Sequence, residues 1–201
     1  YRVAATFEPH PLAVLRPESA PAALTSLDQR LRLLEGTGLD GVLVLEFTRD
    51  FAAQTPEEFV DRVFVDALHA AAVVVGADTR FGVRNVGTVQ TLVDLGASRG
   101  FHVVGVEDVG EGGRWSSTRV REALAAGDLD TATDILGRPP RVDGTVVHGD
   151  HRGRLLGFPT ANLGGAIEGM IPADGVYAGW LTRLDLPEGA ADRSLPTAIS
   201  V

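Results

Sequence analysis

A basic segment punctuated by glycines offers the clearest chemistry in the chain. It runs from Gly144 to Leu163 and carries four glycines, two arginines and two histidines around a Pro-Thr-Ala-Asn turn. Glycine permits the positive φ angles and the close backbone approach through which consecutive N–H groups converge on an anion. Thr160 and Asn162 add short oxygen-bearing side chains suited to a metal–phosphate group. The segment predicts a phosphate-binding loop on β-structure, and the alternative is a turn-rich hairpin with a solvated basic tip.

A second anion site is predicted where a helix begins, within Trp115-Ser-Ser-Thr-Arg-Val-Arg121. Ser117 and Thr118 would lie beside the free N–H groups and the positive dipole end of that helix. Arg121 follows one turn later and can point back to the same anion. A charge-assisted arginine contact contributes about 1.5–3 kcal/mol, against about 0.5–2 kcal/mol for dipole and hydroxyls, so loss of Arg121 should cost more. The alternative is a simple helix cap whose arginine faces solvent.

Two further turns carry groups that could contact a nucleotide. His10 lies between two prolines, and Asp78 lies in Gly76-Ala-Asp-Thr-Arg-Phe-Gly82, where it could accept a hydrogen bond from a ribose or a base. Each could also be an ordinary surface turn. His69 and His102 have no partner at metal-ligand spacing and are interpreted as structural. No Ser-His-Asp or paired-carboxylate spacing is evident.

Composition narrows the class of partner. The 201 residues are 44% hydrophobic and 22% charged, which is typical of a soluble globular protein, and the net charge is −9. This charge argues against general binding to nucleic acid or to an anionic membrane. The sequence has no cysteine, and no apolar run is long enough for a membrane helix or a signal peptide. We therefore expect a cytoplasmic protein that handles small anions, and a weak homo-oligomer is compatible with the sequence.

Strand and helix patterns alternate about four times over the first two-thirds of the chain. Expected strands cover 3–7, 42–47, 72–76 and 102–106; expected helices begin near 26 and at a Thr55–Glu58 capping box, and cover 89–99, 116–126 and 128–136. This alternation predicts an α/β domain with a doubly wound parallel sheet. Ligands of such sheets bind beyond the carboxyl ends of the strands, where His10, Asp78 and the Ser117 helix start would lie.

The helical rhythm stops at Gly137-Arg-Pro-Pro140, and short β segments follow. Expected strands cover 142–147, 155–163, 175–181 and 195–201, with loops at 164–173 and 185–194. The sequence thus predicts a small antiparallel β-barrel, or alternatively a sandwich, with domains at 1–137 and 138–201. A domain of this size buries only about 60% of its extended surface. We therefore expect residues 138–201 alone not to fold cooperatively.

Five motifs, in order, resemble one family, the prokaryotic bifunctional riboflavin kinase/FMN adenylyltransferases, also called FAD synthetases. Three are similar to motifs of its adenylyltransferase module and two to motifs of its kinase module. They are Thr6-Phe-Glu-Pro-His-Pro11, Val75-Gly-Ala-Asp-Thr-Arg-Phe-Gly82, Trp115-Ser-Ser-Thr-Arg-Val-Arg121, Arg152-Gly-Arg-Leu-Leu-Gly-Phe-Pro-Thr-Ala-Asn-Leu163 and Pro172-Ala-Asp-Gly-Val-Tyr-Ala178. The resemblance spans essentially the whole chain.

The resemblance implies two ATP- and Mg²⁺-dependent steps, riboflavin to FMN and FMN to FAD with release of pyrophosphate. It assigns the catalytic roles to Arg121, Thr160 and Asn162, with Thr160 and Asn162 also holding the metal. The implied ATP-binding residues of the adenylyltransferase are His10, Asp78, Ser117, Thr118 and Arg121. Those of the kinase are Gly149, Arg152, Gly153, Gly157 and Thr160.

Several departures from the family pattern qualify this expectation. The family's His-x-Gly-His motif belongs before Tyr1, and its catalytic glutamate belongs after Val201. Asp78 replaces a common asparagine, and Thr79 replaces a usual aromatic residue, which weakens any stacking role there. We expect the 201 residues alone to be nearly inactive in both reactions. The alternatives are a non-catalytic flavin- or nucleotide-binding module, and a nucleotidyltransferase with another acceptor.

Overall fold

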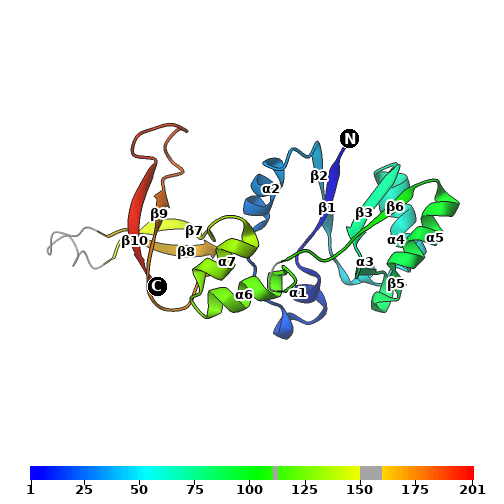
Figure 1. Ribbon diagram of the computed structural model, residues 1–201, viewed down its shortest axis with the longest axis horizontal. Coiled ribbons are helices and arrows are strands. Elements are labelled where there is room, and N and C mark those ends of the chain that lie inside the picture. Colours follow the sequence, from blue (N-terminus) through cyan, green and yellow to red (C-terminus); the bar gives the residue numbers. More distant parts are fainter. Residues whose placement is uncertain (111–112, 150–159) are drawn as a thin grey trace. The chain divides into compact units, whose positions relative to one another are not determined.

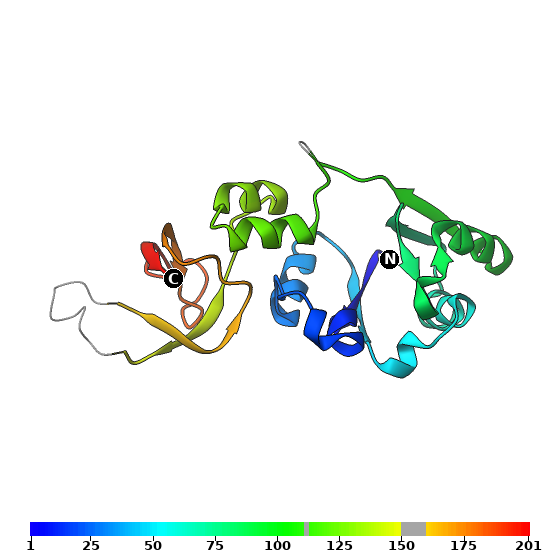
Figure 2. The same cartoon turned by 90° about the horizontal axis from the view of Figure 1, so that it is seen from below.

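The computed structural model describes residues 1–110, 113–149 and 160–201, and its chain divides into two compact units. Unit 1 comprises Tyr1–Pro21 and Leu27–Trp115, and unit 2 comprises Ala22–Ser26 and Ser116–Val201. Figures 1 and 2 show the two units in two views. The helices α6 (Ser117–Ala125) and α7 (Leu129–Leu136) therefore group with the strands that follow them. The division into functional modules at 137/138 stays a prediction.

Unit 1 alternates strands and helices along the chain. Its strands are β1 (Val3–Glu8), β2 (Gly41–Glu46), β3 (Ala72–Gly76), β4 (Arg80–Phe81), β5 (Gly87–Thr88) and β6 (His102–Val106). Its helices are α1 (Pro11–Leu15), α2 (Leu27–Glu35), α3 (Arg49–Ala52), α4 (Pro56–Val60) and α5 (Val89–Arg99), with 3-10 turns η1 (Pro17–Ser19) and η3 (Val83–Asn85) and the π-helix η2 (Asp61–Ala67).

The long strands of unit 1 pair in parallel, which confirms the α/β prediction. β1 pairs with β2 from Val3↔Gly41 onward, and β3 pairs with β6 from Ala72↔His102 onward. Among the described residues these form two separate two-stranded pairs rather than one continuous sheet (Figure 1). The alternation suggests one continuous doubly wound sheet, whereas the described residues form two separate parallel pairs. The short β4 and β5 add one antiparallel pair.

A run of phenylalanine rings links the two halves of unit 1. Neighbouring rings lie 5.4–6.1 Å apart between centroids, mostly edge to face, from β1 through α3, α4 and η2 to the start of β6. Such contacts contribute about 0.5–1.5 kcal/mol each beyond the area they bury. The rings are those of Phe7, Phe47, Phe51, Phe59, Phe64, Phe81 and Phe101. We call this set the phenylalanine run.

The capping box predicted at Thr55 is confirmed. The Thr55 hydroxyl accepts from the Glu58 N–H, and the Glu58 carboxylate accepts from the Thr55 N–H. An apolar stripe that includes Val60 and Val63 follows the capping box and continues into the π-helix η2, whose widened turn is closed by a hydrogen bond from Leu68 N to Val63 O. Val60 and Val63 are buried there, so the stripe faces the core.

Unit 2 places an α-helical hairpin beside antiparallel strands. Its strands are β7 (Asp143–Val147), β8 (Asn162–Glu168), β9 (Val176–Thr182) and β10 (Ser194–Ser200). β7 pairs with β8, and β9 pairs with β10. Within the described residues the strands form these two ribbons, and no closed barrel is present. β8 also continues through part of the loop expected at 164–173, because an irregularity in β8 between Gly164 and Glu168, opposite Gly144 of β7, absorbs the extra residues.

The core of unit 2 lies under α6 and α7. Val120, Leu124 and Ala132 are fully or almost fully buried, and Met170 packs against them from the segment after β8. Backbone bonding ties the same regions together, because Ala173 N donates to Leu124 O at 2.9 Å. The helical hairpin and the segment between β8 and β9 therefore pack against each other.

Candidate functional site

His10 follows β1 and begins helix α1. Its Nδ1 accepts a hydrogen bond from Leu12 N at 3.1 Å, so the imidazole caps the helix. A neutral imidazole that accepts at Nδ1 carries its proton on Nε2 and can donate there. The ring is therefore held in a defined orientation beyond the carboxyl end of β1, where the sequence predicts a ligand contact.

Asp78 follows β3, and its carboxylate is engaged by Arg114. Arg114 Nη1 donates to Asp78 Oδ2 at 2.5 Å, and Arg114 Nε lies 3.1 Å from an Asp108 carboxylate oxygen. This hydrogen bond, followed by the charge of the guanidinium, holds the pKa of Asp78 below its ordinary value and raises that of Arg114. All three side chains are about half exposed. Sequence analysis missed Arg114, although its position directly before the Trp-Ser-Ser-Thr run was a usable signal.

Helix α6 begins where the sequence predicts an anion site. Ser116 is the N-cap and accepts from Arg119 N at 3.3 Å, which leaves Ser117 and Thr118 exposed in the first turn. Arg121 Nε donates to Ala22 O at 2.7 Å. Partial burial lowers the pKa of the Arg121 guanidinium, which stays protonated at any physiological pH. Arg121 is thus tethered at Nε.

The five predicted adenylyltransferase residues fall in both units. His10 and Asp78 lie in unit 1, whereas Ser117, Thr118 and Arg121 lie in unit 2. His10 and Asp78 follow strands of unit 1, and Ser117 and Thr118 lie in the first turn of α6. Their assembly into a single ATP site stays a prediction.

Of the predicted kinase residues, the structure describes Gly149, Thr160 and Asn162, which lie at one end of the β7–β8 ladder. Asn162 opens β8 opposite Val147, and Gly149 follows β7, so the ladder brings the Gly149 backbone against the Asn162 amide. A Cβ atom at Gly149 would overlap that amide unless the Asn162 side chain moved. Thr160 and Asn162 are exposed. Arg152, Gly153 and Gly157 lie outside the described residues.

Thr160 and Asn162 have the chemistry that Mg²⁺ prefers. A hydroxyl and an amide oxygen are hard ligands, and Mg²⁺ is commonly bound by one or two protein oxygens together with substrate phosphates. In the described part of the chain no group of three or more His, Cys, Asp or Glu side chains could hold a metal ion alone. A magnesium ion at this ladder could take waters and substrate phosphate oxygens as its further ligands.

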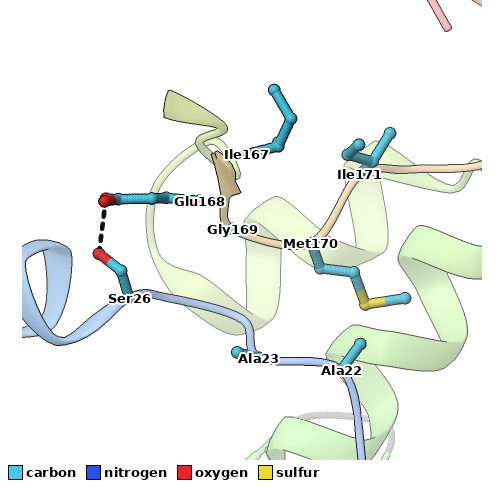
Figure 3. Close-up of a pocket in the computed structure, with 8 residues that line it drawn as sticks. All are labelled: Ala22, Ala23, Ser26, Ile167, Glu168, Gly169, Met170 and Ile171. Carbon is cyan, nitrogen blue, oxygen red and sulfur yellow. Dashed lines mark hydrogen bonds between the residues drawn. The ribbon is translucent and has the colours of Figure 1, made fainter. Parts of the chain in front are cut away.

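Unit 2 also contains an open pocket of about 490 Å³, shown in Figure 3. It is lined by Ala22, Ala23, Ser26, Ile167, Glu168, Gly169, Met170 and Ile171. Ser26 Oγ donates to Glu168 Oε2 at 2.7 Å at one end, and the rest of the lining is mainly apolar. None of the predicted site residues lines it.

Both halves of the chain match known protein families. The FAD synthetase family model matches residues 1–119, and the riboflavin kinase family model matches residues 136–200. The bifunctional riboflavin kinase/FMN adenylyltransferase of Escherichia coli K12 is 43% identical over 173 residues, which cover 86% of this chain and 55% of that protein. The enzyme of the same description from Pseudomonas fluorescens is 42% identical over 172 residues, covering 85% and 55%. The chain thus spans about half the length of these relatives.

A solved structure is also similar. A crystal structure described as a macrolide-efflux protein from Streptococcus pneumoniae superposes with a TM-score of 0.81 at 30% identity, covering 98% of this chain and 62% of that one. That description belongs to the pneumococcal protein. In the described part of the present chain, no helix combines the length and the apolar character needed to cross a bilayer.

Proposed function

Because the chain belongs to the FAD synthetase family, we propose that its protein makes FMN and FAD from riboflavin and ATP. The observation that carries the proposal is the tandem order of the two matches, FAD synthetase over 1–119 and riboflavin kinase over 136–200. One polypeptide would then phosphorylate riboflavin and adenylylate the product. We place the protein in the cytoplasm, since both steps consume ATP.

The proposed kinase step uses the end of the β7–β8 ladder. The ribityl 5′-hydroxyl oxygen of riboflavin attacks the γ-phosphorus of ATP, the bond to ADP breaks, and the hydroxyl proton leaves to a base. Thr160 and Asn162 would hold a magnesium ion, which when bound neutralises charge on the phosphates. Gly149 leaves room for the Asn162 amide, so it keeps the metal ligand in place. Arg152, Gly153 and Gly157 would complete the ATP contacts.

The proposed adenylyltransferase step uses the remaining predicted residues. An FMN phosphate oxygen attacks the α-phosphorus of a second ATP, and the bond to the β-phosphate breaks to release pyrophosphate. Ser117, Thr118 and Arg121 would bind the ATP phosphates at the positive end of α6. His10 would donate from Nε2, and Asp78 would accept from a nucleotide hydroxyl. Positioning and charge neutralisation supply the catalysis.

The test uses the complete product of the reading frame that encodes this chain. It is incubated with riboflavin, ATP and Mg²⁺, and FMN and FAD are separated by chromatography. Thr160→Ala should lower FMN formation about 100-fold while leaving FMN-to-FAD conversion intact. Arg121→Met should lower FMN-to-FAD conversion about 10- to 100-fold and spare the kinase. Each variant is thus the control for the other.

Failure would take a clear form. A complete protein that binds FMN and ADP but forms neither product would be a binding module rather than an enzyme. A protein that transfers an adenylyl group only to an acceptor other than FMN would point to a different nucleotidyltransferase.

A further inference from the structure

The side chain of Arg30 joins helix α2 to the carboxyl end of β1. Its Nη1 donates to Thr6 Oγ1 at 3.0 Å and to Phe7 O at 2.9 Å, and its Nη2 lies 3.4 Å from Glu8 Oε2. These three acceptors belong to the last three residues of the strand. The Arg30 side chain is only 30% exposed. One guanidinium therefore holds the whole end of β1.

The place of these contacts is what suggests a role beyond stability. Ligands of parallel sheets bind beyond the carboxyl ends of the strands. The residue two positions after β1 is His10, whose ring is oriented by its bond from Leu12 N. This local bond orients the ring relative to its own turn, whereas the position of that turn depends on the end of β1. The hydrogen bonds of Arg30 hold the end of β1 from the side of helix α2.

Besides its backbone pairing with β2, the end of β1 has an aromatic support. The Phe7 ring lies 5.4 Å from the ring of Phe47 and 5.7 Å from that of Phe51. Aromatic packing restrains the strand laterally but offers no hydrogen bond to the Phe7 carbonyl, which Arg30 supplies. The two supports are therefore not interchangeable.

We infer that Arg30 is a positioning residue of the adenylyltransferase site, acting through the β1 terminus on His10. The inference rests on the proposed function for its catalytic consequence, whereas the positioning of His10 can be measured independently. A planar guanidinium presents several donors in a fixed fork and so reaches three acceptors at once. Lysine has one nitrogen and would hold only part of this arrangement.

The first experiment measures both activities in the complete protein. Arg30→Met should lower kcat for FMN adenylylation about tenfold, because small displacements of reacting groups are costly. The KM values should change less than twofold, and riboflavin phosphorylation should be unchanged. Arg30→Lys should recover part of the loss.

The matched control is Arg99→Met. Arg99 makes a bidentate ion pair with Asp61 at the end of α5, and its side chain is 24% exposed. Arg99 lies just before the amino end of β6, whereas ligands of parallel sheets bind beyond the carboxyl ends of the strands. Loss of its ion pair should therefore lower Tm without lowering kcat. If Arg30→Met matches the wild-type kcat, or lowers both activities in step with Tm as a folding defect would, the inference is wrong.

A second readout separates this inference from the proposed function. In the same complete protein, the NMR signals of the His10 ring are assigned by their loss in His10→Gln. Their chemical shifts should change in Arg30→Met and stay unchanged in Arg99→Met. If the wild type forms no FAD but these resonances move, the proposed function fails and the positioning role stands. If they do not move, Arg30 does not position His10, whatever the activity.

Discussion

Arg114 binds Asp78 across the carboxyl ends of two neighbouring parallel strands. Asp78 follows β3, and Arg114 lies in the segment after β6, where its Nη1 donates to Asp78 Oδ2 at 2.5 Å. The Arg114 guanidinium thus already binds the Asp78 carboxylate, which we propose accepts a hydrogen bond from a nucleotide hydroxyl. Nucleotide binding would have to share or displace this contact.

The same contact makes Asp78 sensitive to the charge beside it. Its pKa is held below the ordinary value by the hydrogen bond and charge of Arg114. A depressed pKa in the folded state means that the pair stabilises the fold above the unfolded value of about 3.9. That stabilisation is lost as the pH falls through the lower folded-state pKa. Arg114→Met should raise the Asp78 pKa, measured by NMR titration of its carboxyl carbon.

Asp128 provides the control for this titration. Its pKa is lowered by hydrogen bonds from Thr131 at the start of α7 and does not involve Arg114. It should titrate identically in the variant and the wild type. An unchanged Asp78 pKa in Arg114→Met would mean that the ion pair is not formed in solution.

Gly96 should tolerate no side chain, although it lies within a helix. A Cβ there would lie 2.7 Å from Phe101 O and 3.0 Å from the Phe101 ring. Gly-to-Ala exchange in a helix gains up to about 1 kcal/mol, but overpacking costs about 1–3 kcal/mol. Gly96→Ala should therefore lower the free energy of unfolding by about 1–2 kcal/mol in urea titrations. Gly105→Ala, whose Cβ would meet only a Val89 methyl at 3.9 Å, should stay within about 0.5 kcal/mol of wild type.

Local signals in the sequence predicted much of unit 1. The strands at 72–76 and 102–106 and the helix at 89–99 occur with the predicted bounds, because apolar runs and hydroxyl caps act over a few residues. The π-helix was not predicted, since the same apolar stripe suits an α-helix. The division of the sheet into two pairs was not predicted either. It depends on which strands pair with each other and not on the sequence of any one strand.

The site shows the same division between local and distant determinants. His10 and Asp78 were predicted as candidates because each follows a strand within a Gly- or Pro-rich turn. Arg30 gave no signal, because its acceptors lie 22 to 24 residues earlier in the chain. The grouping of α6 and α7 with the β-strands was also missed, because Met170 and Ala173 contact Leu124 only once the chain has folded.

The start of α6 allows the capping and ligand roles of its serines to be separated. Ser116 accepts from Arg119 N, whereas Ser117 is exposed in the first turn. Ser116→Ala should cost about 1 kcal/mol of local stability, seen as faster hydrogen exchange of the α6 amides. Ser117→Ala should leave that exchange unchanged and weaken ATP binding in the adenylyltransferase assay. If Ser117→Ala speeds the exchange as much as Ser116→Ala, Ser117 is part of the cap and not a ligand.

The boundary of unit 2 predicts which fragment folds. Residues 138–201 lack α6 and α7, so Met170 would lose its buried partners and Ala173 N would lose the Leu124 carbonyl. Tyr177, whose hydroxyl donates to Ala173 O at 2.6 Å, would lose the packing surface at Gly127. Residues 116–201 should therefore melt cooperatively by calorimetry, whereas residues 138–201 should show no sharp transition. A sharp melt of 138–201 would mean that the two ribbons are stable without the helical hairpin, and that α6 and α7 only rest on them.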